Sequence, residues 1–170
     1  GLTQIAEYLD GRSNVAQIHI ISHGAAGRLY LGGEVVTADT LSAHAADIAA
    51  IGRSLSESGD ILIYGCDVAA GPDGQAFVDR FAALTEADLA ASEDLTGSAA
   101  HGGDWDLEYQ AGTINVQAFA AVNWEQLLNP IAITNVDGTT VTATTLANNI
   151  AGAGVTVVAD LNGDRIGVVA

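Results

Sequence analysis

Two short apolar runs, placed far apart in the chain, limit the folds that this sequence can adopt. They are AQIHIIS (residues 16–22) and DILIY (residues 60–64), and both are rich in β-branched residues. Continuous apolar strands of this kind are typical of a parallel sheet that is buried on both faces. Between them, residues 39–58 carry apolar side chains at helical spacing. A strand, a helix and a second parallel strand form a right-handed βαβ unit, so the sequence predicts an α/β fold.

Further elements are predicted on both sides of this unit. Helical periodicity predicts helices over residues 2–9, 73–86 and 117–128. Residues 87–92 read as a third strand, and glycine turns at Gly32–Gly33 and Ala111–Gly112 predict two hairpins. These elements make up one predicted domain over residues 1–128.

The amino-acid composition of the sequence changes at Asn129–Pro130. Beyond this point the chain is rich in threonine and poor in charge. We therefore place a boundary there, and expect residues 129–170 to be a linker followed by the start of a β-rich segment. Residues 143–164 resemble the opening of anchor-type β domains in bacterial surface proteins.

The charge of the chain argues against several classes of partner. Its 170 residues include 21 acidic and only 5 basic side chains, which gives a net charge of −16 at pH 7. Such a surface repels phosphate backbones and anionic lipid, so we expect no binding to nucleic acid. We also expect no membrane insertion, because no apolar stretch reaches the roughly 18 residues that a membrane span needs.

The end of each predicted parallel strand carries a chemically reactive side chain. His23 follows the first strand and Cys66, the single cysteine of the chain, follows the second. Parallel strands joined by a crossover end at the same edge of the sheet, which is where open α/β sheets place their sites. A neighbouring imidazole makes a thiol more reactive, and it can also protonate a leaving amine. We therefore expect His23 and Cys66 to form a catalytic pair, although a small core thiol and a structural histidine are the alternative.

Glycines beside this pair favour the same chemistry. The backbone amides of Gly24 and Cys66 can approach a developing oxyanion, because no Cβ blocks the way at a glycine turn. We predict that these two amides hold the oxyanion.

Several stretches resemble known protein families. IHIISHG (residues 18–24) followed by ILIYGCDVAAG (residues 61–71) resembles the caspase-like cysteine peptidases of clan CD, in which a His-Gly ends one strand and a cysteine ends the next. A closer resemblance is to an uncharacterised domain family of giant, repeat-bearing bacterial surface proteins. Its pattern is similar to HIISHG, IYGCDVAAG and LTGSAAHGGDWDLE, and to the tryptophan of the final predicted helix, over roughly residues 1–128.

The resemblance implies a fold and an activity. The implied fold is a caspase-like three-layer sandwich, with a mostly parallel sheet flanked by helices. The clan has a strand and a helix before the histidine strand, whereas this chain begins in a helix. That strand therefore lies on a missing segment, or this sheet edge is built differently.

The implied activity is that of a cysteine endopeptidase, with His23 as base or acid and Cys66 as nucleophile. Its substrate is a polypeptide, including its own chain, within a larger secreted or cell-surface protein. The junction near Asn129–Pro130 is topologically convenient for self-cleavage. The alternative is a non-catalytic structural or adhesive module on the same scaffold.

Acidic residues near the predicted site are candidates for substrate binding. In clan CD the segment after the cysteine strand lines the substrate pocket, and acidic residues there select Arg or Lys. Asp94 and Asp67 are the candidates here, and solvated turn residues are the alternative. No HExxH or CxxC spacing occurs, so we expect no zinc site and no cofactor. Calcium is left open, because spare carboxylates and the partial loop DLNGD (residues 160–164) could hold it.

Overall fold

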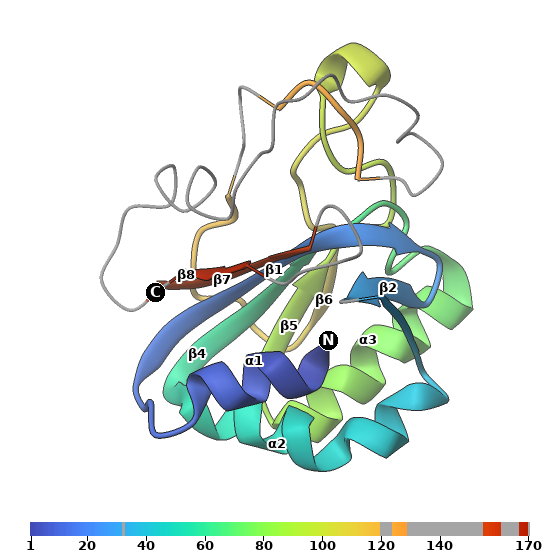
Figure 1. The fold of residues 1–170 in the computed structure, drawn as a ribbon. Coiled ribbons are helices and arrows are strands. Elements are labelled where there is room, and N and C mark those ends of the chain that lie inside the picture. The colour runs from blue at the N-terminus through green and yellow to red at the C-terminus, as the bar shows by residue number, and fades with distance from the viewer. Residues whose placement is uncertain (32, 120–123, 129–154, 161–166, 170) are drawn as a thin grey trace.

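The computed structural model describes residues 1–31, 33–119, 124–128, 155–160 and 167–169 (Figure 1). Its helices are α1 (Leu2–Leu9), α2 (Ala45–Ser54) and α3 (Gly71–Thr85), with short 3-10 turns η1 (Thr40–His44) and η2 (Ala99–His101). Its strands are β1 (Val15–Ala25), β2 (Arg28–Leu31), β3 (Glu34–Thr37), β4 (Leu55–Tyr64), β5 (Asp88–Ala91), β6 (Tyr109–Ala111), β7 (Val155–Asp160) and β8 (Gly167–Val169).

The strands form one sheet in the order β3-β2-β1-β4-β5-β6, and β7 pairs with β1 and β8. The predicted α/β class is confirmed, and β1, β4 and β5 pair in parallel as the βαβ pattern required. The sheet as a whole is mixed rather than mostly parallel. The predicted hairpin of β2 and β3 adds antiparallel strands on one side, and β6 runs antiparallel to β5 on the other.

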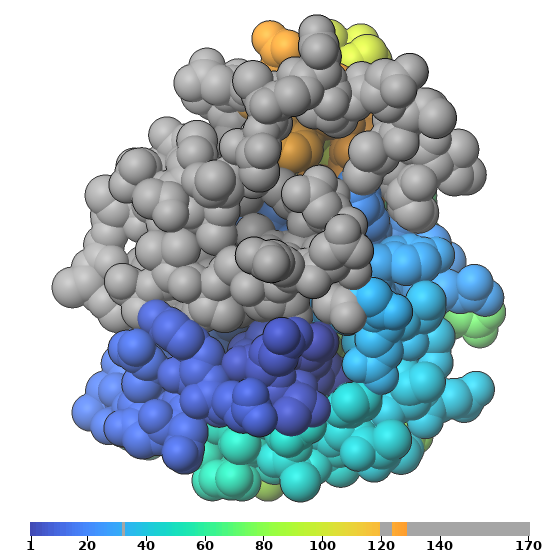
Figure 2. All heavy atoms as spheres, viewed as in Figure 1, coloured from blue at the N-terminus to red at the C-terminus, as the bar shows by residue number. Residues whose placement is uncertain are grey.

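One face of the sheet is covered by the three helices (Figure 1). Helix α1 lies against α2, and α2 lies against α3, and Figure 2 shows α1 and α2 side by side on the surface. Alternate residues of the central strands point into this layer, where they pack on fully buried helical side chains such as Ile5, Ile48 and Phe77. None of the helices in the described part of the chain is long and apolar enough to cross a membrane.

The opposite face is covered differently from our prediction. It carries a second apolar cluster: Ile21, Leu62, Tyr64, Cys66, Ala90, Trp105, Leu107, Phe119 and Leu128. The irregular segment after β5 supplies the outer half of this cluster (Figure 1). Within the described residues this face therefore has no helical layer, and the expected three-layer sandwich is not formed there.

The predicted helix over residues 117–128 is wrong for the residues of that range that the structure describes, 117–119 and 124–128. Their backbone groups are used in tertiary pairing instead. Ser98 N–H donates to the Gln126 carbonyl at 2.9 Å, and Leu128 N–H donates to the Thr96 carbonyl at 2.9 Å. These bonds replace the i to i−4 bonds that a helix would need.

Two other boundaries also differ from prediction. Helix α2 ends at Ser54 rather than near residue 58, because Leu55 already pairs with Val15 and the register shifts before Asp60.

The predicted hairpin at Ala111–Gly112 is absent. The residues after Gly112 turn back toward β4 instead, where Asp60 Oδ2 accepts the backbone N–H groups of Asn115 and Val116 at 2.8 and 3.0 Å.

The buried His19 makes the fold sensitive to acid. Its ring stacks on Tyr64 with centroids 5.7 Å apart, and burial lowers the pKa of His19 to about 4. Below about pH 6.5 the unfolded chain takes up a proton that the folded chain refuses, so stability falls as the pH decreases toward 4. The full effect is about 3 kcal/mol in the free energy of unfolding.

We predict that His19→Phe, which keeps the stacked ring, reduces this loss between about pH 7 and about pH 4.5 in urea unfolding. His44→Gln provides a control of opposite sign. The hydrogen bond with Glu34 raises the pKa of His44, so its stabilising charge is present at low pH and is lost as the pH rises. If His19→Phe loses as much unfolding free energy on acidification as the parent, the acid sensitivity does not come from His19.

The ends of β1 and β4 approach each other so closely that Gly24 has no room for a side chain. A Cβ at Gly24 would lie 2.5 Å from Val68 Cγ2 and 2.8 Å from the Cys66 carbonyl oxygen. We predict that Gly24→Ala lowers the free energy of unfolding by at least about 1–3 kcal/mol, as overpacking does. Gly11→Ala is the control, because a Cβ there meets nothing within 4 Å and only the left-handed φ of 72° is penalised. If Gly24→Ala and Gly11→Ala lose the same free energy of unfolding in denaturant, the close contact at Gly24 does not contribute to stability.

Candidate functional site

The pairing of β1 with β4 brings the strand ends that precede His23 and Cys66 side by side. From Gln17↔Asp60 to Ile21↔Tyr64 the two strands keep a constant offset of 43 residues. His23 and Cys66 have the same offset, so each lies two residues beyond the last paired position of its strand. The expectation that both emerge at one edge therefore agrees with the register.

His23 lies on the face of β1 that carries the second apolar cluster. His19 and Ile21 contact Tyr64 and the rest of that cluster, and alternation along β1 gives His23 the same side. The backbone of His23 pairs with Tyr30 of β2, and its carbonyl accepts the Ser22 hydroxyl at 2.9 Å. Only 8% of its surface is exposed. The backbone of His23 is therefore held by β2, and its side chain is largely buried.

Cys66 is fully buried within the second apolar cluster. Its thiol donates to the Thr96 carbonyl, with Sγ and the oxygen 3.5 Å apart. Burial raises the pKa of the Cys66 thiol to about 11, and the negative charge of Asp67 acts in the same direction. The thiol is consequently protonated at neutral pH.

The predicted oxyanion donor Gly24 already holds a peptide carbonyl. Its N–H donates to the carbonyl oxygen of Leu128 at 3.1 Å. Leu128 is itself fully buried in the cluster that contains Cys66. The peptide carbonyl of Leu128 thus lies beside the end of β1, next to the strand ends that carry His23 and Cys66.

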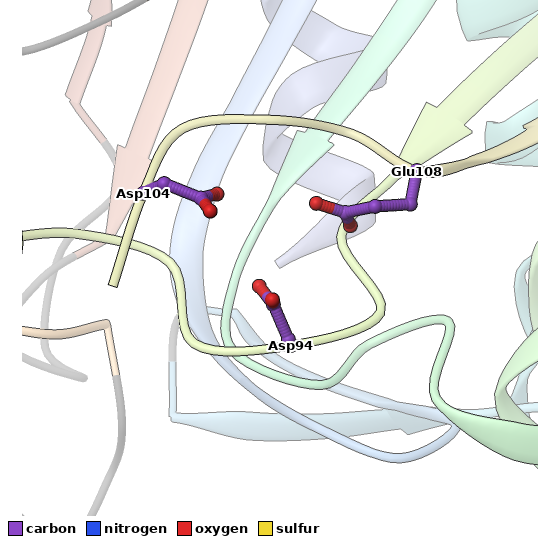
Figure 3. A group of neighbouring side chains, drawn as sticks. All are labelled: Asp94, Asp104 and Glu108. Atoms are coloured by element: carbon purple, nitrogen blue, oxygen red, sulfur yellow. The ribbon is translucent and has the colours of Figure 1, made fainter. Parts of the chain in front are cut away.

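Asp67 and Asp94 meet through their backbones beside this edge. The Asp67 N–H donates to the Asp94 carbonyl at 2.7 Å, and Asp67 has a left-handed φ of 61°. The carboxylate of Asp94 is directed toward Asp104 and Glu108 (Figure 3). Partial desolvation and repulsion from Asp104 and Asp67 raise the pKa of Asp94. The two predicted binding residues therefore belong to one acidic loop region.

Three carboxylates of that region are close enough to share a cation. One oxygen each of Asp94, Asp104 and Glu108 lies within 4.8 Å of the others (Figure 3). Desolvation raises the pKa of Glu108, while its hydrogen bond from the Glu93 N–H at 2.8 Å opposes the rise. Hard divalent ions such as Ca²⁺ prefer ligands of this type. All three residues are exposed, so the group fits a weak cation site and equally a solvated acidic loop.

Sequence reasoning missed the residues that cover the thiol. Thr96 and Leu128 lie over it from outside the sheet, and Leu128 falls in a segment that we predicted to be helical. Glycines at 97 and 103 were the available signal, because closely spaced glycines indicate a place where another backbone approaches.

Comparison with known proteins gives one match. Residues 1–128 match the family described as Domain of unknown function (DUF4347). No curated protein and no solved structure matches the chain. The prediction of an uncharacterised domain family is thereby confirmed, whereas its caspase-like character stays a prediction. The match covers most of the chain, which therefore belongs to the DUF4347 family.

Proposed function

We propose that this domain is a cysteine endopeptidase that uses Cys66 as nucleophile and His23 as the proton-transfer group. The observation that carries the proposal is that β1 and β4 end side by side, with His23 and Cys66 each two residues beyond the last pair and Gly24 packed against the Cys66 backbone. The adjacent Gly24 N–H supports it, because that amide is already bonded to a peptide carbonyl.

In the proposed reaction, the thiol proton passes to His23 while Sγ attacks the carbonyl carbon of the substrate. The amides of Gly24 and Cys66 stabilise the oxyanion, and each such donor is worth roughly 2.7–4 kcal/mol of transition-state stabilisation. His23 then gives its proton to the departing amine, which leaves a thioester at Cys66. Water hydrolyses the thioester and restores the thiol.

The burial of Cys66 favours a substrate within the same chain. The groups that cover the thiol are Thr96 and the segment that ends at Leu128. An external peptide would have to displace them, whereas a covalently attached segment is already in position. We therefore propose self-processing as the main activity, within a secreted or surface protein as the family resemblance implies.

Asp67 and Asp94 are proposed to bind the substrate through the acidic region at this edge. Their mutual electrostatic repulsion with Asp104 supports the proposal, because a cationic side chain or a Ca²⁺ ion would relieve it.

A second candidate function is a non-catalytic structural or adhesive module. The observation that favours it is the thiol itself, which is fully buried and has a pKa raised to about 11. Thiols of structural core cysteines are inert, whereas catalytic thiols are usually partly exposed and have lowered pKa values.

We predict that Cys66→Ala abolishes cleavage and that His23→Ala reduces it by at least about a hundredfold, in line with the usual size of acid–base catalysis. Cleavage is measured by intact mass of the full chain and by a panel of fluorogenic peptides. His101→Ala is the matched control, because His101 is exposed on η2 and lies outside the proposed machinery. Absence of any Cys66-dependent cleavage would favour the non-catalytic module.

A second prediction follows from the pKa of the thiol. Since the thiolate fraction rises with pH up to about 11, alkylation of native Cys66 is expected to be slow near pH 7 and to accelerate about tenfold per pH unit. The rate of iodoacetamide labelling measures this directly, because Cys66 is the single cysteine in the chain. Denatured protein is the control, and its thiol is expected to reach full reactivity near its ordinary pKa of about 8.5. Rapid labelling of the native protein at neutral pH would overturn the assignment of a sealed thiol.

A further inference from the structure

The segment that ends at Leu128 lies across the candidate site as an extended peptide. Leu127 forms an antiparallel bridge with Gly97. On one side of the bridge Ser98 N–H donates to the Gln126 carbonyl, and on the other Leu128 N–H donates to the Thr96 carbonyl, both at 2.9 Å. Pairing of an extended segment with a neighbouring backbone is a common way to bind a peptide.

Glycines give this segment the space it needs. A Cβ at Gly97 would lie 2.3 Å from the Gln126 carbonyl oxygen and 2.9 Å from Leu127 Cα. A Cβ at Gly103 would lie 2.6 Å from Leu127 Cδ2. A side chain at either position would therefore collide with residues 126 and 127, so the two glycines make room for this segment.

The backbone of Leu128 is held near both the predicted nucleophile and the predicted oxyanion donor. Its carbonyl oxygen accepts the Gly24 N–H at 3.1 Å. Its N–H shares the Thr96 carbonyl with the thiol, since that oxygen lies 2.9 Å from Leu128 N and 3.5 Å from Cys66 Sγ. Two backbone hydrogen bonds therefore fix the peptide groups on either side of the Leu128 Cα: one holds the Leu128 carbonyl and the other holds the N–H of the preceding peptide bond.

The side chain of Leu128 also lies in a defined apolar environment, which we call the seat of Leu128. It is fully buried in the second apolar cluster, whose aromatic members include Tyr64, Trp105 and Phe119. An Arg or Lys side chain would lose its hydration there without gaining a carboxylate in the cluster. This seat selects an apolar residue, in contrast to the basic residue expected from Asp94 and Asp67.

We propose that the bond cleaved by this domain is its own peptide bond between Leu128 and Asn129. The proposal rests on the endopeptidase function and names the substrate of that same site. Cys66 Sγ attacks the carbonyl carbon of Leu128, and the C–N bond to Asn129 breaks. The Asn129 amine takes the proton that His23 received from the thiol. Hydrolysis of the thioester then leaves a carboxylate on Leu128 and a free thiol on Cys66.

The experiment incubates the purified full chain between about pH 7 and about pH 10, where the thiolate fraction increases. Mass spectrometry under denaturing conditions follows the appearance of fragments 1–128 and 129–170. Added hydroxylamine intercepts the thioester, so that residue 128 ends in a hydroxamate in place of a carboxylate. Both products are expected in the parent chain and neither in Cys66→Ala.

Side-chain variants test the seat of Leu128. Leu128→Ala is expected to slow cleavage by at least about tenfold, and Leu128→Met is expected to restore most of the rate because it fills a similar volume. Leu41→Ala is the matched control for lost packing, because Leu41 is fully buried in the helical core and lies outside the cluster of Leu128. Equal rates in Leu128→Ala and Leu41→Ala would overturn the role of this side chain.

The outcomes separate this inference from the proposed function. Cys66-dependent cleavage at another bond, or of external peptides only, would overturn the Leu128 assignment and leave the endopeptidase function standing. A chain that stays intact and cleaves no peptide would overturn both. Cleavage after Leu128 that persists in Cys66→Ala would exclude the thiol mechanism.

Discussion

The parallel pairing of β1 with β4 is the constraint on which the rest of the structure depends. Its constant register sets which side chains share a level and which face each strand residue presents. A slip by one residue would move His23 to the helical face and break the match with Cys66. The close contact of Gly24 with the Cys66 backbone reinforces this register at the strand ends. The same hydrogen-bond ladder therefore fixes both the core and the candidate site.

The two faces of the sheet have different physical characters. The helical face is built mainly from aliphatic and aromatic side chains, and it provides the main hydrophobic stabilisation. The other face mixes apolar side chains with His19, His23 and Cys66. Polar groups are costly to bury, and burial lowers the pKa of His19 and raises that of Cys66. Covering this face with an irregular segment, rather than a helix, leaves backbone carbonyls such as that of Thr96 available to the thiol.

Local periodicity predicted the elements whose stability comes from burying one apolar face. Helices α1 and α3, the paired strands β1 and β4, and the common edge of His23 and Cys66 follow from patterns within the sequence. Residues 117–128 did not follow, because their helical spacing of apolar residues competes with pairing to residues 96–98, which lie close only in the folded chain. The seat of Leu128 could not be read for the same reason, since its contacts come from Gly24, Thr96 and Tyr64, all distant in sequence. Long-range backbone pairing leaves little trace in local composition.

The pairing of strand β7 with β1 would hold the two products of self-cleavage together. It pairs in parallel with β1 from Gln17↔Val155 to Ser22↔Asp160, while the hairpin strand β2 takes the remaining edge of β1 from His23 onward. A nick after Leu128 would remove the covalent tie between the two pieces but would leave this ladder intact. The nicked protein would then persist as a two-piece complex under native conditions, much as a clipped hairpin stays paired. Release of the distal piece would require a pull along the chain, or a competing strand that takes its place on β1.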